Sequence, residues 1–388
     1  MAPKPKKKSS KFSGGKGRLS RESKPVKWIE SMAVDMIVTL KKISSEYYHE
    51  LPNRPDAHEA RLFYKNIPTR RNRYGDIPCL DKTRVALIDA RDGNDYIHAN
   101  WVTMPNARCR YIMTQAPLPE TTADFWSMVW QENVSLIVCL TKIFEQGKMK
   151  TLEYWPTSCG KQFHQKHGHV HIRNVGVRNE PHFALTLLEA VNEKSMERRK
   201  IQHYLYLDWP DHRVPICTHN FLQVVRYVDE EIANYKGKEP MTIVVHCSAG
   251  VGRSGTLVAL QSLVGSVNEG QVPQVCQVVS MVRKQRAMAV QGPEQYLFLY
   301  WALTVHITSC CQIPLEAKKD LLKRLVLMKN CSTKSACSLS PITTDQPDAA
   351  TSSARQARNE DGGDRKRRPS NVKRKTPRGS VTVRKSKP

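Results

Sequence analysis

Hydrophobic residues recur at spacings typical of secondary structure only in the middle of the chain. Helical spacing starts the patterned region, where the apolar positions are Val26, Trp28, Ile29, Met32, Ile37 and Leu40. Helix in pieces is therefore expected from residue 26 towards Leu51.

Further along, short apolar stretches alternate with amphipathic ones. The expected strands are 96–102, 111–115, 136–140, 170–177, 202–207 and 242–246. The expected helices are 124–133, 219–235, 255–268, 272–285 and one that follows Pro293 and ends near residue 312. This alternation predicts an α/β domain with a mixed sheet.

The composition divides the chain into four parts. Residues 1–25 are rich in Lys, Ser and Gly, and residues 331–388 are rich in Ser, Thr, Pro and charge, so both are expected to be disordered basic tails. Residues 26–312 form the predicted domain. Residues 313–330 predict a short basic amphipathic helix. We expect that helix to dock on its own domain, and a membrane or partner helix is the alternative.

Most of the formal net charge of +25 comes from the ends of the chain. Residues 1–27 contain ten basic residues and one acidic residue, and residues 350–388 contain thirteen and three. The eleven cysteines are irregularly spaced and follow no signal peptide pattern, so we expect reduced thiols. The apolar run 134–140 is too short to span a bilayer. A cytoplasmic or nuclear location, or both, is expected.

One segment between an apolar strand and a helix has the chemistry of an anion site. It reads His-Cys-Ser-Ala-Gly-Val-Gly-Arg-Ser-Gly-Thr and covers residues 246–256. Gly250 and Gly252 allow the backbone angles with which consecutive amides converge on phosphate oxygens, at the positive end of a helix. Arg253 follows Cys247 after five residues, so its guanidinium can grip two oxygens beside the sulfur.

The same amides and Arg253 favour the thiolate form of Cys247, and His246 could orient the loop. Attack of that thiolate at phosphorus would give a cysteinyl phosphate. The alternative is an ordinary buried cysteine before a flexible turn, and the conjunction of strand, Cys, Arg, Ser, Gly and helix argues against it.

This loop resembles the signature of the classical, non-receptor protein tyrosine phosphatases, and other family motifs follow the same order along the chain. They are the phosphotyrosine-recognition loop 72–76, the segment 111–130, the glutamate loop 145–156, the mobile acid loop 209–211 and the glutamine loop 291–296. The resemblance covers about residues 30 to 310. It implies the phosphatase fold, a twisted mixed β-sheet flanked by helices on both faces, with a strand–phosphate loop–helix active site in one catalytic domain.

The resemblance also implies a role for each catalytic residue. Asp211 would protonate the leaving phenolate and later accept a proton from water, within a loop that closes through Trp209 and Pro210. Gln291 would position that water, with Gln295 in support. Ser254 would stabilise the departing thiolate of Cys247.

Substrate-binding roles come from the same resemblance. Tyr74 would stack on the phenyl ring and exclude the shorter phosphoserine, and Asp76 would accept hydrogen bonds from peptide amides. The remaining positions assigned to substrate binding are Ser248, Ala249, Gly250, Val251, Gly252, Gln295, Glu145, Lys150 and His212. The implied substrates are phosphotyrosine-containing proteins. No cofactor and no metal is expected.

Four positions depart from the family pattern, namely Ala116, His212, Arg213 and Gly292. The two that follow the acid could weaken loop closure, make it sensitive to pH or favour acidic peptides. The alternative function is therefore a weakly active or inactive phosphotyrosine-binding scaffold of the same fold.

The basic tails suggest a second set of partners. Residues 365–368 and 373–375 resemble a nuclear localisation patch, and residues 6–8 are a second candidate. Equally, these runs could hold nucleic acid or an anionic membrane surface through salt-sensitive contacts. The sequence leaves the oligomeric state open.

Overall fold

The computed structural model describes residues 20–52, 54–90, 92–105, 107–160, 164–210, 213–310 and 313–333. These residues fall within one compact unit, Met1–Ile342. Most of both predicted tails therefore lies outside the described residues, and so do Asp211 and His212.

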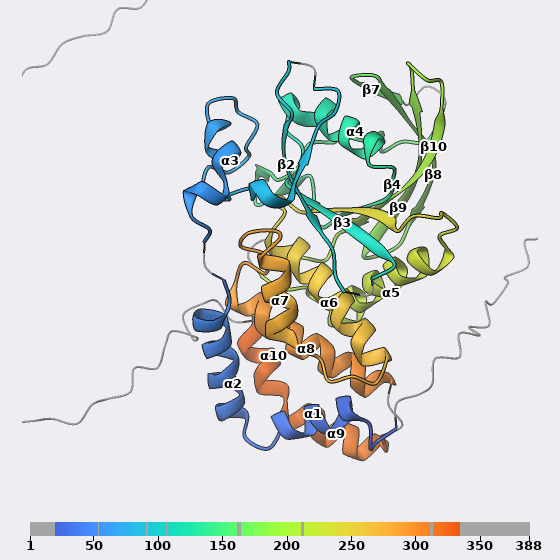
Figure 1. Ribbon diagram of the computed structural model, residues 1–388. Helices are drawn as coiled ribbons and strands as arrows, with labels where there is room; N and C mark the ends of the chain where they lie inside the picture. The colour runs from blue at the N-terminus through green and yellow to red at the C-terminus, as the bar shows by residue number, and fades with distance from the viewer. Residues whose placement is uncertain are drawn as a thin grey trace, which may run out of the picture. The chain divides into compact units, whose positions relative to one another are not determined.

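A nine-stranded mixed sheet forms the centre of this unit (Figure 1). In spatial order its strands are β1 (Arg84–Ala86), β2 (Tyr96–Val102), β3 (Cys109–Thr114), β11 (Met241–His246), β4 (Val134–Cys139), β10 (Arg198–Tyr206), β9 (Phe183–Asn192), β8 (Val170–Asn179) and β7 (His164–His167). The four strands β3, β11, β4 and β10 run parallel, and the outer pairs are antiparallel. This arrangement confirms the predicted α/β fold with a mixed sheet.

The central strands are apolar because both faces of the sheet are covered. In β11, Ile243 and Val245 belong to one hydrophobic cluster, whereas Val244 belongs to another on the opposite face. A strand buried on both sides must be apolar at successive positions, which explains the run Ile-Val-Val before Cys247.

Helices cover both faces, as predicted. Figure 1 shows α6, α7 and α8 on one side of the sheet and α4 on the other. The α-helices are α1 (Lys24–Met32), α2 (Met36–Ser45), α3 (Arg61–Lys65), α4 (Thr122–Gln131), α5 (Thr218–Asn234), α6 (Gly252–Asn268), α7 (Val275–Arg283), α8 (Pro293–Cys310), α9 (Leu315–Arg324) and α10 (Val326–Thr333). Shorter elements are the π-helical turn Glu46–Glu50, the 3₁₀ turns Ala57–Glu59, Asp81–Thr83 and Pro119–Thr121, and the hairpin β5 (Phe144–Glu145) and β6 (Lys148–Met149).

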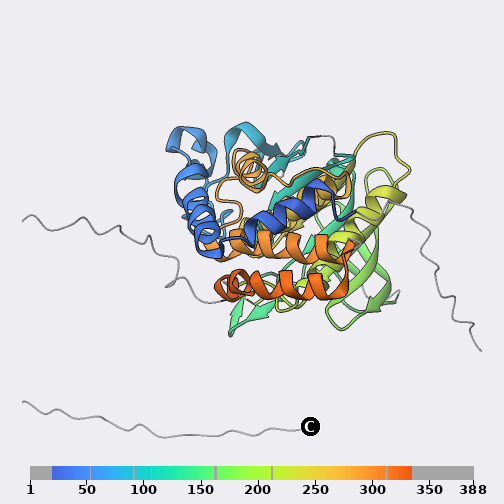
Figure 2. The same cartoon turned by 90° about the horizontal axis from the view of Figure 1, so that it is seen from below.

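Several boundaries differ from the sequence-based expectation. Helix α1 begins at Lys24, inside the expected tail, and α6 begins at Gly252 rather than at residue 255. The segment expected as one basic helix over 313–330 forms two helices, α9 and α10. The buried side chains of this segment, Leu321 in α9, Leu325 between the helices and Met328 in α10, join the core. Figure 2 shows both helices running along α8. Among the described residues, no helix combines the length and the apolarity that crossing a bilayer requires.

Candidate active site

The segment after β11 forms a tight loop that leads directly into α6. Gly250 has a φ of +71°, and a Cβ at this position would lie 1.9 Å from the backbone oxygen of Thr114. Only glycine therefore fits here. The turn directs the Gly250 amide at Cys247, whose Sγ accepts this hydrogen bond at 3.2 Å, and Cys247 is 5% exposed.

Backbone carbonyl groups of this loop accept hydrogen bonds from residues outside the loop. The amide of Ala116 donates to the Ser248 oxygen at 2.9 Å. The guanidinium of Arg286 donates to the Ala249 oxygen at 3.0 Å and to the Gly250 oxygen at 3.1 Å. With its carbonyls occupied on the outer side, the loop can turn its amides inward to form an anion-binding nest.

Arg286 is a structural residue that the sequence-based interpretation missed. Its side chain is fully buried, and it also donates to Asn100 Oδ1 at 2.8 Å and contacts His98 Nδ1 at 3.1 Å. Burial of the guanidinium lowers its pKa, and the hydrogen bonds to oxygen atoms compensate part of the desolvation. A lone arginine near the end of a helix gives no sequence signal for this contact with a loop 36 residues earlier.

Arg253 and Glu145 form a buried ion pair at the edge of the loop. The two guanidinium nitrogens of Arg253 donate to the two carboxylate oxygens of Glu145, each at 2.7 Å, and the side chains are 6% and 8% exposed. Burial raises the pKa of Glu145, but hydrogen bonds and charge from Arg253 outweigh burial and leave this pKa below its usual value. The β5–β6 hairpin thus brings Glu145 to the guanidinium that the sequence placed beside Cys247.

His246 is held by a buried chain of hydrogen bonds. Its Nε2 lies 2.6 Å from the hydroxyl of Tyr154, which lies 2.8 Å from Nε2 of His203. Its Nδ1 lies 3.0 Å from the Cys247 oxygen. Burial lowers the pKa of His246 to about 4, so the ring is neutral at pH 7 and orients the backbone of Cys247 rather than supplying a charge.

Tyr74 stands at the rim of the same loop. Its hydroxyl lies 2.8 Å from Ser248 Oγ. The Ser248 hydroxyl donates to the backbone oxygen of Lys150 at 2.9 Å. Asp76 is exposed nearby. The structure thus brings together the recognition loop, the phosphate loop and the glutamate loop, which are far apart in the sequence.

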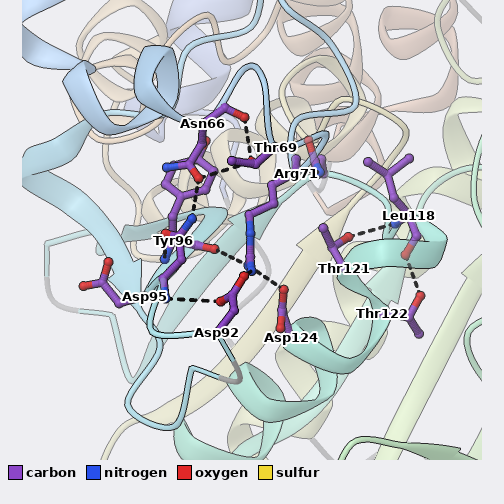
Figure 3. A network of polar contacts seen from close by, with 12 residues as sticks. Asn66, Thr69, Arg71, Asp92, Asp95, Tyr96, Leu118, Thr121, Thr122 and Asp124 are labelled. Carbon is purple, nitrogen blue, oxygen red and sulfur yellow. Dashed lines mark hydrogen bonds and ion pairs between the residues drawn. The ribbon is translucent and has the colours of Figure 1, made fainter.

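The segment before Tyr74 is anchored by Arg71, as Figure 3 shows. Arg71 forms ion pairs with Asp92 and, at 2.7 Å, with Asp124, and it donates to the Tyr96 oxygen. The Tyr96 hydroxyl donates to Asn72 Oδ1 at 2.6 Å. These contacts fix the recognition loop on β2 and α4.

The loops enclose one pocket with a volume of about 410 Å³. Its lining residues are Tyr74, Asp76, Ile77, Lys148, Met149, Lys150, Cys247, Ser248, Ala249, Gly252, Arg253, Gln291 and Gln295. Both glutamines approach the phosphate loop, because a Cβ at Gly252 would lie 2.9 Å from Gln295 Oε1 and 3.4 Å from Gln291 Oε1. Ser254 Oγ is buried and has no hydrogen-bond partner within the described ranges.

In and around the acid loop, the structure describes the chain up to Pro210 and again from Arg213. Trp209 is buried against the rings of Phe221 and Phe298, and its Nε1 donates to the Arg213 oxygen at 2.7 Å. The predicted acid Asp211 and the unusual His212 lie outside the described residues. Within the described part of the chain, no cluster of three or more His, Cys, Asp or Glu side chains could hold a metal ion.

A strand leads into the loop that carries Cys247, this loop leads into α6, and residues of the tyrosine, glutamate and glutamine loops line the same pocket. The family model of the protein-tyrosine phosphatases matches residues 68–304, which is more than half of the chain. The chain therefore belongs to the protein-tyrosine phosphatase family.

Curated relatives agree with this assignment. Human tyrosine-protein phosphatase non-receptor type 9 is 41% identical over 245 residues, which cover 60% of this chain and 41% of the relative. Human tyrosine-protein phosphatase non-receptor type 2 is 34% identical over 256 residues, covering 66% and 60%. Tyrosine-protein phosphatase 69D of Drosophila melanogaster is 34% identical over 290 residues, covering 71% and 19%. The chain thus spans less than two thirds of the length of each of these relatives.

Proposed function

We propose that this protein hydrolyses phosphotyrosine in proteins through a phosphocysteine at Cys247. The observation that supports this most strongly is one pocket lined by Cys247, Arg253 and both glutamines, with Tyr74 at its rim. A thiolate held by the Gly250 amide can attack phosphorus, while Arg253 and the inward amides bind the phosphate oxygens.

In the first step, the thiolate of Cys247 forms a bond to phosphorus and the bond from phosphorus to the phenolic oxygen breaks. Asp211 gives its proton to that oxygen, which is worth roughly 10²- to 10⁴-fold in rate. The ion pair with Glu145 fixes the orientation of the Arg253 guanidinium, which can then meet phosphate oxygens without losing further side-chain freedom.

In the second step, water attacks the phosphocysteine, its proton passes to Asp211 and the thiolate leaves. Gln291 and Gln295 lie over Gly252, where they can orient this water. The buried hydroxyl of Ser254, directly after Arg253, can donate to the leaving sulfur.

Selectivity for phosphotyrosine follows from the position of Tyr74. Its ring forms a wall whose hydroxyl is fixed to Ser248 at the phosphate loop. A phenyl ring can fill the space beside this wall and carry phosphate to Cys247, which is 5% exposed, whereas a serine side chain is too short. The exposed Asp76 can then bind amides of the substrate peptide.

Turnover of matched peptides tests this proposal. The parent protein should release phosphate from a phosphotyrosyl peptide and much less from its phosphoseryl counterpart. Cys247→Ser should abolish release, and Asp211→Ala should lower it about 100-fold or more. A parent that is no faster than Cys247→Ser would contradict the enzymatic function and would leave the phosphotyrosine-binding scaffold as the alternative.

The tails extend the proposal to cellular location. The basic runs 365–368 and 373–375 suit nuclear import, and the same charges suit contact with nucleic acid or an anionic membrane. Removal of residues 334–388 should abolish nuclear enrichment if import is their role. It should abolish salt-sensitive binding to nucleic acid or to anionic vesicles if their role is anion binding.

A further inference from the structure

The turn that carries Gln291 has an unfavourable backbone conformation. Residues 287–292, the glutamine turn, connect α7 to α8, and Met288 and Val290 have φ angles of +61° and +55°. Left-handed angles at residues other than glycine are energetically unfavourable, and they persist only where surrounding contacts impose them.

Contact with α6 is one reason for this conformation. The Val290 amide donates to the Val251 oxygen at 3.1 Å. A Cβ at Gly255 would lie 2.5 Å from the Val290 nitrogen, so the turn approaches the first turn of α6 more closely than any other residue type would allow. This approach places the side chain of Gln291 over Gly252, within the pocket of Cys247.

Arg283, in the last turn of α7, supplies a second restraint. Its guanidinium donates to the Ala289 oxygen and to the Val290 oxygen, each at 2.9 Å. A third nitrogen donates to the Pro52 oxygen at 3.2 Å. One side chain thus ties the glutamine turn to a segment that precedes the residues matched by the family model.

Tyr47 completes the restraint at Gln291 itself. Its hydroxyl donates a short hydrogen bond to the Gln291 backbone oxygen. Its ring lies 5.1 Å from the Arg283 guanidinium, which is a cation–π distance. Burial raises the pKa of Tyr47, so the hydroxyl keeps the proton that it donates.

The segment 46–52, the N-terminal clamp, is itself anchored on the opposite side. Glu46 is 8% exposed and accepts hydrogen bonds from the hydroxyls of Tyr296, at 2.8 Å, and Tyr300. The Cys276 thiol lies 3.8 Å from Glu50 Oε2. Helix α2 leads into the clamp beside α7 and α8 (Figure 1). The clamp is therefore fixed to both helices that flank the glutamine turn.

We propose that Tyr47 is a positioning residue for hydrolysis of the phosphocysteine, acting through the backbone of Gln291. The inference rests on the proposed function, and it assigns the N-terminal clamp to the second chemical step. In that step the oxygen of water bonds to phosphorus, the phosphorus–sulfur bond breaks, its electrons stay on Cys247 and the proton passes to Asp211. A Gln291 side chain held in one place admits water, whereas a displaced one leaves room for a larger alcohol.

Two matched variants test this inference. Tyr47→Phe removes only the hydroxyl that holds Gln291. Tyr48→Phe removes a hydroxyl from the next residue, which is 39% exposed and whose ring meets Tyr47 edge-on at 5.1 Å. Rapid mixing with an aryl phosphate measures phenol release, and added glycerol measures how the phosphoenzyme divides between water and alcohol.

For Tyr47→Phe, we expect hydrolysis of the phosphoenzyme to slow about fivefold, as expected for one hydrogen bond. The ratio of glycerol phosphate to inorganic phosphate should rise by a similar factor. The rate of the phenol burst and kcat/KM should stay at the parent values, whereas kcat and KM should fall together with the hydrolysis rate. Tyr48→Phe should match the parent in all of these quantities.

If the ratio of glycerol phosphate to inorganic phosphate is the same in the parent and in Tyr47→Phe, the inference is overturned. This holds even if the variant melts at a lower temperature, because the hydroxyl would then serve stability alone. A parent protein that releases no phenol from the aryl phosphate would overturn the proposed function instead. The two failures are thus distinguished within one experiment.

Discussion

Two loops meet over Cys247, and they are held in different ways. The phosphate loop, 247–252, is fixed by groups that are fully buried, above all Arg286 and His246. The glutamine turn, 287–292, is fixed by Arg283 and by Tyr47, which both lie partly exposed near the surface.

The two loops also differ in which residue types adopt left-handed backbone angles. The phosphate loop takes its left-handed angle at Gly250, where it costs little, whereas the glutamine turn takes such angles at Met288 and Val290. The phosphate loop conformation is thus compatible with its own sequence, and that of the glutamine turn is imposed by neighbouring segments. We expect damage to the first loop to affect the whole fold, and damage to the second to affect one chemical step.

The largest expected effect comes from the buried arginine. Arg286→Met would leave the Ala249 and Gly250 oxygens and Asn100 without their donors, in the core. Buried polar groups that lose a charged partner cost about 3–5 kcal/mol, so the melting temperature should fall by about 10 °C and activity should be lost. Calorimetry measures this loss. A fully folded and active Arg286→Met protein would contradict the claim that Arg286 holds the phosphate loop in place.

A matched pair of glycine substitutions compares the loops directly. Gly250→Ala places a Cβ 1.9 Å from the Thr114 oxygen at a φ of +71°, whereas Gly292→Ala meets only Glu294 Oε2, at 3.0 Å. Phosphotyrosyl peptide turnover should fall more than about 100-fold in the first variant, because the amide nest is displaced. It should change less than about twofold in the second, since a flexible side chain can move aside. Similar losses in both variants would contradict the difference between the loops.

Acidification should lower the free energy of unfolding, because three buried histidines lie near the phosphate loop, in β2, β10 and β11. Burial lowers the pKa of His246 to about 4 and that of His98 and His203 to about 3. Below about pH 6.5 the unfolded chain binds protons that the folded chain does not, so stability falls as pH falls. Each histidine contributes at most about 1.4 kcal/mol per pH unit.

Urea unfolding at several values between pH 7 and pH 5 measures this effect, in a range where most carboxylates stay ionised. The free energy of unfolding should be constant above pH 7 and should decrease steadily below 6.5. A flat profile down to pH 5 would mean that the three rings are not held neutral.

A smaller loss than that of Gly250→Ala is expected at the Arg253–Glu145 pair. Glu145→Gln keeps one oxygen acceptor but loses the second and the charge, so turnover should fall about tenfold as Arg253 loses its fixed orientation. The lowered pKa of Glu145 means that the ionised pair persists as pH falls towards its usual value of 4.5 and is lost only below it. The difference between parent and variant should therefore stay constant from pH 7 to pH 5. Equal turnover in both proteins would show that the pair does not orient Arg253.

Much of the fold was predictable because its central strands carry a strong local signal. The expected strand 242–246 corresponds to β11, and the expected helix 219–235 corresponds to α5 within one residue at each end. The start of α6 was placed three residues late because glycines at 250, 252 and 255 suggest a longer loop than the helix leaves. Strand β9, Phe183–Asn192, was missed because its partly exposed positions include Leu185, Leu187 and Val191, so its residue types do not alternate between apolar and polar.

The candidate site was predictable where a motif carries the chemistry and not where tertiary contacts do. The structure brings Cys247, Arg253, Gln291 and Tyr74 to one pocket, as their motifs implied. Arg286 and Tyr47 gave no signal, because each acts on a backbone more than 30 residues away. The left-handed angle of Val290 contradicts the local preference of a β-branched residue, so no local rule could find it.

The central claim is that phosphate passes through Cys247, and trapping the intermediate tests it most directly. The protein is mixed with a phosphotyrosyl peptide and quenched with denaturant at neutral to alkaline pH within the first turnover, because a phosphocysteine is labile in acid, and the modified residue is located by mass spectrometry. We predict phosphate on Cys247, formed with the tyrosyl product and lost as inorganic phosphate appears. Turnover without phosphate on Cys247, or turnover in Cys247→Ser, would contradict the account.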